Sequence, residues 1–222
     1  MSFTRTNPSP RYQELVSLYK DMHLKGIPEQ GLAPEKLYIG ASLLSQLPTI
    51  RGLVRKSGAR TLLDYGSGKG YYYTATSIPL PNGETASTIS QYLGVDRIRC
   101  YDPAVAQHAT LPDESFDAVI STDALEHCPV EDVPWIVDEM FSRANRMVFA
   151  NVASYSAAKT LPNGENAHAT QQPAAWWDDL LKSIAARYPH VRYYFAIVEV
   201  KRGSLLRMMK KRKSTTILST FD

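Results

Sequence analysis

The sequence is poor in cysteine and has no long apolar run, and both absences narrow the class of protein. Only Cys100 and Cys128 occur in 222 residues, which excludes a disulfide scaffold and a multi-cysteine zinc site and favours a reducing compartment. No uncharged apolar segment approaches the roughly 18 residues of a membrane-spanning helix. Residues 1–11 also lack the apolar centre of a signal peptide. We therefore expect a cytoplasmic protein with no membrane association and no metal.

An excess of positive charge is confined to one segment. The chain carries 25 Lys and Arg against 22 Asp and Glu, a net charge of +3. Seven of these basic residues and no acidic ones lie between Lys201 and Lys213, so the rest of the chain has a balance of −4. The basic run is therefore expected to be a local feature of a hairpin or loop between the last two strands. It is either a patch for a partner or a solvated connection.

The order of the predicted helices and strands indicates the fold class. Apolar residues at helical spacing predict helices over residues 12–23, 41–54, 132–141 and 173–184. Short apolar segments predict strands over residues 60–65, 97–101, 116–121 and 146–152, a faint one within 105–110, and two closing strands over 190–200 and 215–220. This alternation is typical of an α/β fold, a doubly wound and mostly parallel sheet of about seven strands with helices on both faces.

The length and composition predict one compact domain. With 222 residues, of which 44% are hydrophobic, the chain builds a core without a disulfide or metal. Residues 1–57 are expected to form an N-terminal helical extension, and residues 58–222 the sheet domain. Sheets of this kind bind ligands at the carboxyl ends of their strands, so we expect the site in the loops that follow those ends.

A glycine-rich loop follows the first predicted strand. Residues 64–70 read Asp-Tyr-Gly-Ser-Gly-Lys-Gly. A P-loop requires glycine where Leu63 stands and Ser or Thr where Gly70 stands. A dinucleotide fingerprint requires glycine where Tyr71 stands. Both patterns fail, and Asp-x-Gly-x-Gly-x-Gly remains.

That remaining pattern resembles the first motif of class I S-adenosylmethionine-dependent methyltransferases, which have a Rossmann-like fold. The resemblance implies that the loop passes under the amino acid part of S-adenosylmethionine and that the acid binds its ammonium group, directly or through water. Three alternating glycines also carry an entropic cost that packing alone does not offset. The cofactor-binding residues implied here are Asp64, Gly66, Ser67, Gly68, Gly70 and Tyr71.

A second acid follows the next predicted strand. The resemblance implies that Asp102, with Pro103 beside it, binds the two ribose hydroxyls, since a carboxylate accepts two hydrogen bonds at once. The separation from Gly70 exceeds the ~20 residues of a minimal unit, because residues 74–94 look like an inserted loop. Asp96 is the weaker alternative. For the adenine, the sequence offers the candidates His108 and Ala109.

The segment around the fourth strand supports the same family. Residues 111–127, from Leu-Pro-Asp to Leu-Glu-His, resemble the corresponding region of its small-molecule members. The acids Asp123 and Glu126 and the imidazole of His127 are expected to face the donor methyl group, and Asp123 also to contact the cofactor. His127, with a reference pKa of about 6.5, is the candidate general base. Its alternative is a structural histidine in the wall of the cleft.

The long loop after the fifth strand is assigned to the methyl acceptor. About twenty residues without periodicity inside a compact domain usually indicate function or disorder. His168 is a further catalytic candidate, beside His127 and Asp123. With Glu126 and His127, the predicted substrate-binding residues are Tyr155, Lys159, Asn166, His168 and Trp176.

Together these residues predict methyl transfer from S-adenosylmethionine to an oxygen or nitrogen of a small polar molecule, with S-adenosylhomocysteine as product. Tyr12, Tyr19 and His23 are expected to close the pocket as part of a lid. One alternative is a nucleic-acid methyltransferase that uses residues 201–213. It is disfavoured because residues 121–126 lack the Asn/Asp-Pro-Pro-aromatic stretch of base methylation. The other is a non-catalytic protein that binds S-adenosylmethionine.

Overall fold

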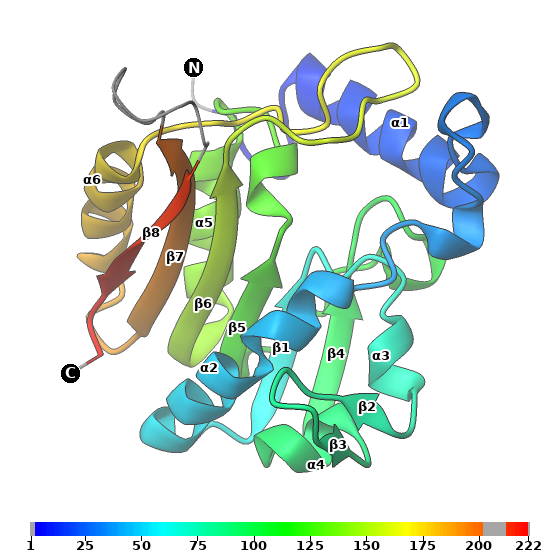
Figure 1. Ribbon diagram of the computed structural model, residues 1–222. Coiled ribbons are helices and arrows are strands. Elements are labelled where there is room, and N and C mark those ends of the chain that lie inside the picture. The colour runs from blue at the N-terminus through cyan, green and yellow to red at the C-terminus, as the bar shows by residue number, and fades with distance from the viewer. Residues whose placement is uncertain (1–2, 202–211, 222) are drawn as a thin grey trace, which may run out of the picture.

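The computed structural model describes residues 3–201 and 212–221, and a six-stranded sheet forms its centre (Figure 1). The order is β4-β1-β5-β6-β7-β8, and all neighbours pair in parallel except β7 and β8. The predicted α/β fold is confirmed, while residues 202–211 of the basic run lie outside the described residues. The strands are β1 (Thr61–Tyr65), β4 (Arg97–Tyr101), β5 (Phe116–Thr122), β6 (Ala144–Ser154), β7 (Arg192–Lys201) and β8 (Arg212–Ser219).

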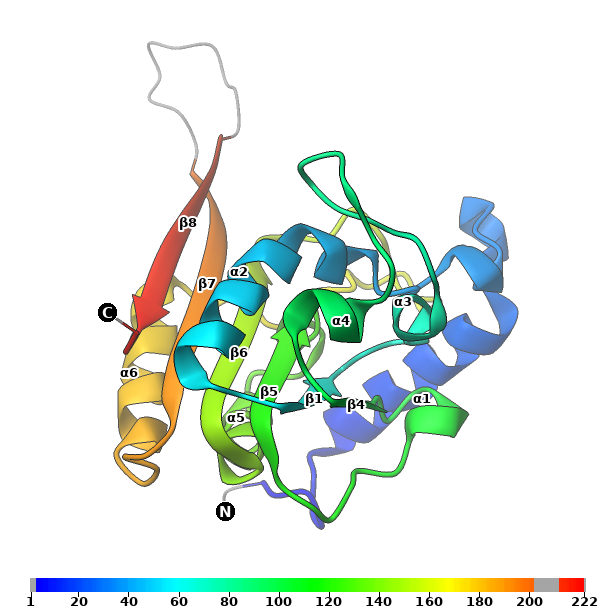
Figure 2. The ribbon, with the colours of Figure 1, turned by 90° about the horizontal axis from the view of Figure 1, so that it is seen from below.

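Helices cover both faces of the sheet, as Figure 2 shows. On one face lie α2 (Ala41–Ser57) and α4 (Ile89–Leu93), and on the other α5 (Val133–Ser142) and α6 (Ala174–Ala185). The central strands are apolar on both faces because both are buried. In β6, Met147 and Phe149 pack in the core beneath α2, whereas Val148 and Ala150 pack in the core beneath α5.

Two segments differ from the sequence-based expectation. The inserted residues 74–94 are not a bare loop, because they contain α4 and a two-stranded sheet of β2 (Ile78–Pro79) and β3 (Thr85–Ala86). Residues 105–110 form no strand and instead contain a single 3-10 turn, η3 (Ala106–His108). The main sheet therefore has six strands rather than about seven, and β4 forms its edge. A short helix, α3 (Tyr71–Thr74), follows the glycine loop.

The N-terminal helix α1 (Pro10–Lys25) lies across the carboxyl ends of the strands (Figure 1). Ser9 caps it by accepting a hydrogen bond from the Tyr12 amide at 2.9 Å. Both the amide and the hydroxyl of Ser9 donate to the buried Asp132. Before the helix, Arg5 pairs with Glu139 of α5. These contacts fix the start of α1 against the sheet domain.

The connection from α1 to α2 contains the turns η1 (Pro28–Gln30) and η2 (Pro34–Lys36). It contacts the glycine loop, because the Tyr38 carbonyl accepts a hydrogen bond from the Lys69 amide at 3.0 Å. Within residues 3–201 and 212–221, no helix has the length and apolar character needed to cross a membrane.

Candidate active site

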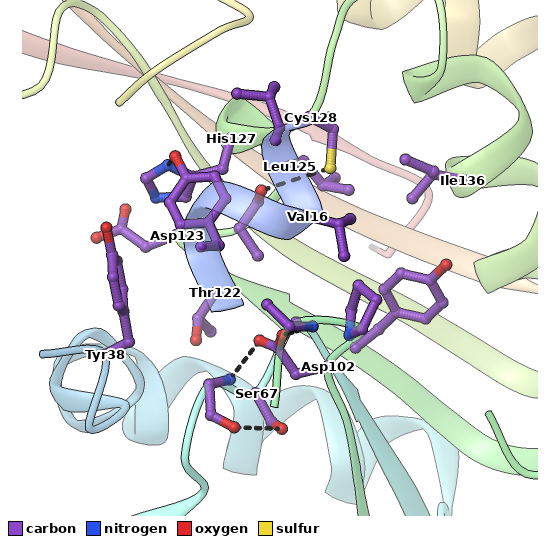
Figure 3. A pocket seen from close by; sticks show the side chains of 18 of the residues that line it. Val16, Tyr38, Ser67, Asp102, Thr122, Asp123, Leu125, His127, Cys128 and Ile136 are labelled. Atoms are coloured by element: carbon purple, nitrogen blue, oxygen red, sulfur yellow. Dashed lines mark hydrogen bonds between the residues drawn. The ribbon is translucent and has the colours of Figure 1, made fainter. Parts of the chain in front are cut away.

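A cavity of about 140 Å³ lies at the carboxyl ends of β1, β4 and β5, beneath α1. Figure 3 shows that its two ends differ in chemistry. Tyr38, Asp123 and His127 lie at one end, which is polar, and Ile136 lies at the other, which is apolar. The apolar end is formed by side chains from α1, α5 and the loop between β5 and α5. They include Leu15, Val16, Leu125, Cys128, Pro129 and Ile136.

The glycine loop lines the cavity with its backbone. Gly66 and Gly68 have φ angles of +82° and +57°, which favour glycine. A Cβ atom on Gly66 would lie 2.5 Å from the Ala124 Cβ, and one on Gly68 would lie 2.4 Å from the Tyr38 carbonyl oxygen. The amide of Gly66 also donates to the carbonyl of Tyr101 at 2.8 Å. The loop is therefore held close to the ends of β4 and β5 and to residue 38.

Five residues predicted to contact the cofactor differ in where they lie. Ser67 lines the cavity and is buried. Gly70 lies instead in a separate groove along the free edge of β4. Tyr71 is 58% exposed and is not among the residues that line the cavity. The adenine candidate His108 also lines the separate groove, whereas Ala109 lines neither space.

Asp102 reaches the cavity wall, together with Pro103. Its carboxylate accepts hydrogen bonds from the amides of Gly68 and Ala104, each at 2.9 Å. Burial raises the pKa of Asp102, and these two amide bonds oppose that shift. The alternative candidate, Asp96, pairs with Arg60 beyond the amino end of β4. Of the two acids, only Asp102 therefore contacts the cavity.

Asp64 lies behind the glycine loop rather than in the cavity lining. One carboxylate oxygen accepts a hydrogen bond from the Tyr73 hydroxyl at 2.7 Å. The other is buried and has no hydrogen-bond partner within the described part of the chain. Burial raises the pKa of Asp64 to about 7. The acid of the glycine motif is therefore partly protonated at neutral pH.

Replacing Asp64 with asparagine is expected to reduce the loss of stability that accompanies rising pH. Because the pKa of Asp64 is raised to about 7 in the folded protein, the folded state holds a proton that the unfolded state releases near pH 3.9. Between about pH 5 and pH 7, this group alone lowers the free energy of unfolding by about 2 kcal/mol. The asparagine oxygen still accepts the Tyr73 bond but does not titrate. Urea unfolding at both pH values measures the difference, and equal pH dependence in both proteins would contradict the assignment.

The two acids after β5 have different surroundings. Asp123 is exposed, lines the cavity and has a φ of +54°. Glu126 is fully buried, and one of its carboxyl oxygens accepts a hydrogen bond from the Ala153 amide at 2.9 Å. Burial, and secondarily the charge of Asp123, hold the pKa of Glu126 well above its usual range. Glu126 is thus buried behind the cavity wall, and Asp123 is the acid that lines the cavity.

His127 lies at the polar end, in the turn η4 (Leu125–His127). Its Nδ1 atom is 2.8 Å from both the Ala167 carbonyl and the Tyr19 hydroxyl, and that hydroxyl donates to the same carbonyl at 2.7 Å. Because a carbonyl oxygen only accepts, Nδ1 carries the proton and Nε2 has a free lone pair. Burial lowers the pKa of His127 to about 4, and His168 and Lys159 contribute to this shift. His127 is therefore neutral at pH 7 and is a weaker base than its reference pKa indicates.

The loop between β6 and α6 brings some of its predicted residues toward His127. The His168 ring lies 5.1 Å from the His127 ring, and its Nδ1 donates to the Tyr155 carbonyl. The ammonium of Lys159 lies 5.1 Å from the centre of the Tyr38 ring. In both histidines, Nδ1 is therefore the atom that donates to a backbone carbonyl.

Asn166 and Trp176 have other contacts. The Asn166 side chain accepts from the amides of Ala157 and His168 at 2.9 and 3.1 Å, and donates to the Ala157 carbonyl at 2.9 Å. It thereby holds the loop in shape. Trp176 packs on Trp177 in α6, with ring centres 5.1 Å apart, and is not among the residues that line the cavity.

Sequence reasoning missed several residues that line the cavity. Tyr38 and Gly40 come from the connection before α2 and Ser42 from the first turn of α2, where the sequence carries no motif. Thr122 and Cys128 flank the candidates Asp123, Glu126 and His127. The apolar residues of α1 show the helical spacing that also predicts a core-facing helix. Among the residues that the structure describes, no group of His, Cys, Asp or Glu is arranged to hold a metal ion.

Residues 63–144 match the model of a protein family described as Methyltransferase domain. The matched range runs from β1 through α5 and includes the glycine loop, Asp102 and the segment from Asp123 to His127. The match, on this sheet and cavity, indicates a class I S-adenosylmethionine-dependent methyltransferase. Members of this class bind S-adenosylmethionine as methyl donor. No curated protein sequence matches the chain.

Proposed function

We propose that this cytoplasmic enzyme transfers a methyl group from S-adenosylmethionine to an oxygen or nitrogen of a small polar molecule. The choice of a small acceptor rests on one observation: two segments of the chain cover the polar end of the cavity. There the Tyr19 hydroxyl of α1 bonds to the Ala167 carbonyl of the loop after β6 at 2.7 Å, and both segments cross above the strand ends (Figure 1). A covered cavity suits a small molecule better than a nucleic acid strand.

The residues present fit the donor. The apolar end beside Val16, Cys128 and Ile136 suits the adenine. Asp102 would bind the ribose hydroxyls, because a carboxylate that accepts two amide bonds still has free lone pairs. The glycine loop would pass under the methionine part. A Cβ atom on Gly66 or Gly68 would prevent this path of the loop, because it would meet Ala124 or the Tyr38 carbonyl. The unpartnered oxygen of Asp64 is then available to the ammonium group.

With the donor in this orientation, its sulfonium lies toward the polar end. In the displacement, a lone pair of the acceptor forms the new bond to the methyl carbon, and the sulfur keeps the electrons of the broken bond. The methylated acceptor would then release its proton to water. Positioning supplies much of the acceleration of such a reaction. The Nε2 atom of neutral His127 would accept a hydrogen bond from the O–H or N–H group of the acceptor. This hydrogen bond would direct the lone pair of the acceptor toward the methyl group.

The first 57 residues act as a lid in this proposal. Helix α1 covers the apolar end with Leu15 and Val16 and covers the polar end with Tyr19 and His23. The bond from Tyr19 to Ala167 joins this lid to the loop that carries Lys159 and His168. Entry of the donor therefore requires α1 to move, whereas the glycine loop beneath it stays in place.

Calorimetry with the full chain tests the proposal. S-adenosylmethionine and S-adenosylhomocysteine are both expected to bind saturably, whereas an oligonucleotide is expected to release no heat at physiological salt. Formation of S-adenosylhomocysteine in the presence of candidate acceptors then separates an enzyme from a protein that only binds the donor. Absence of binding by either sulfur compound would contradict the assignment, and oligonucleotide binding would favour the nucleic-acid alternative.

A further inference from the structure

A half-buried cation without an acidic partner lies beside the polar end of the cavity. Lys159 is half-buried, and its ammonium lies 5.1 Å from the centre of the Tyr38 ring, which lines the cavity. In the part of the chain that the structure describes, it forms no ion pair. A cation over an aromatic ring gains about 1 kcal/mol, whereas a partly desolvated ammonium favours an anionic partner.

A second cation reaches the same region from the other side. Lys213 of β8 donates a hydrogen bond to the Tyr155 hydroxyl at 2.7 Å and lies 4.4 Å from the centre of that ring. Tyr155 in turn lies 5.8 Å from the His168 ring, and His168 lies 5.1 Å from His127. We call Lys159, Lys213, Tyr155 and His168 the acceptor mouth. Its contacts run from Lys213 through Tyr155 and His168 to His127, which lines the polar end of the cavity.

The acids near the acceptor mouth have other partners. Glu165, in the same loop as Lys159, pairs with Arg11 of α1. Glu126 is buried behind the wall, where one of its oxygens accepts a hydrogen bond from the Ala153 amide. Asp123 faces the cavity, and its carboxylate lies 3.4 Å from the Asn151 amide nitrogen. In the described part of the chain, neither Lys159 nor Lys213 forms an ion pair with a carboxylate. The two cations are thus free to bind an external anion.

We propose that the methyl acceptor carries an oxyanion group, a carboxylate or a phosphate, which Lys159 and Lys213 bind at the acceptor mouth. This inference rests on the proposed function, because it names the chemistry of the acceptor for the same site. The oxyanion would compensate both ammonium groups, and the remainder of the molecule would extend past His168 to His127. The aromatic rings of Tyr38 and Tyr155 favour an acceptor with a flat apolar body between its charge and its reacting atom.

Binding of matched small probes to the full chain loaded with S-adenosylhomocysteine tests this inference. The probes are benzoate, phenyl phosphate and the uncharged benzamide. Their binding is measured by calorimetry or by NMR shifts. At least one oxyanion is expected to bind about tenfold more tightly than benzamide, with weaker binding at high salt. The tighter of the two identifies carboxylate or phosphate as the group recognised. Equal binding of all three probes, or preference for benzamide, overturns the proposal.

Lysine variants locate the effect. In the double variant Lys159→Met and Lys213→Met, the preference for the oxyanion is expected to fall about tenfold, because the side chains keep their apolar stems but lose the charges. Lys159→Arg together with Lys213→Arg is expected to retain it. The matched control is Lys182→Met on α6, where the lysine pairs with Asp178. A preference that survives in the double methionine variant, or that the control also loses, contradicts the inference.

Binding of S-adenosylhomocysteine separates this test from that of the proposed function. All lysine variants are expected to bind it as the unchanged protein does. If it fails to bind the unchanged protein, the proposed function is wrong, yet the probes can still be titrated against the free chain and report on the oxyanion site. If it binds and the probes do not discriminate, only the oxyanion inference fails.

Discussion

Replacing Asp102 with alanine is expected to weaken binding of S-adenosylhomocysteine about a thousandfold, because two charge-assisted hydrogen bonds to the ribose are lost at about 2 kcal/mol each. The same carboxylate also accepts the Gly68 amide at 2.9 Å, so the change removes one attachment of the glycine loop. Calorimetry measures the loss, and circular dichroism shows whether the variant remains folded.

Two further variants make this prediction specific. Asp102→Asn keeps one acceptor oxygen for the Gly68 amide, and we expect it to bind more tightly than the alanine variant but less tightly than the unchanged protein. Asp96→Ala changes an acid of the same strand segment that pairs with Arg60, and it is expected to bind S-adenosylhomocysteine normally. Normal binding by Asp102→Ala, or loss of binding in Asp96→Ala, would mean that the ribose is held elsewhere.

The sheet could be predicted from the sequence because its signals are local. Each central strand is a short apolar run between turn residues, and the register follows once neighbouring strands have both faces buried. The glycine loop was also recognisable, since the positive φ values at Gly66 and Gly68 require the residue that the sequence supplies there. The faint signal within 105–110 gave no strand, because a 3-10 turn forms there and returns the His108 carbonyl to the Asp102 amide.

The walls of the cavity could not be predicted, because they come from segments far apart in the chain. Tyr38 contacts the glycine loop through its backbone carbonyl, and no pattern in its own segment indicates this. The lowered pKa of His127 depends on burial beneath α1 and on His168 and Lys159 of a distant loop. Sequence reasoning singled out His127, which lines the cavity, but the electrostatic surroundings of this residue exist only in the folded chain.

The alternation of β1 explains why Asp64 does not line the cavity. Successive residues of a strand point to opposite faces of the sheet. Tyr65 packs in the core on the α5 side, whereas Asp64 bonds to Tyr73 on the other side. The family resemblance assigned Asp64 to the cofactor without this geometry. The structure places its unpartnered oxygen behind the loop, so any contact with the ammonium group is made from that side.

Replacing His127 with alanine is expected to lower turnover about a thousandfold while binding of S-adenosylhomocysteine stays within about twofold, since a positioned proton acceptor contributes roughly 100- to 10,000-fold. His127→Gln offers a neutral acceptor of similar length and is expected to recover part of the loss. His190→Ala, at the amino end of the sheet, is the matched control. Loss of donor binding in a folded His127→Ala protein would assign His127 to the cofactor instead.

The pH profile of turnover distinguishes a neutral hydrogen-bond acceptor from an ordinary histidine base. His127 acts only when Nε2 is unprotonated, and burial lowers its pKa to about 4. The fraction in the active form therefore stays near one as the pH falls from about 8 to about 5.5, and decreases only as it approaches 4. The unchanged protein is therefore expected to lose no turnover near pH 6.5 through protonation of His127. Its pH profile in that range is expected to match the profile of His127→Gln. An acidic limb near pH 6.5 that disappears in the glutamine variant would show instead that His127 titrates as an exposed base, with the lid open during turnover.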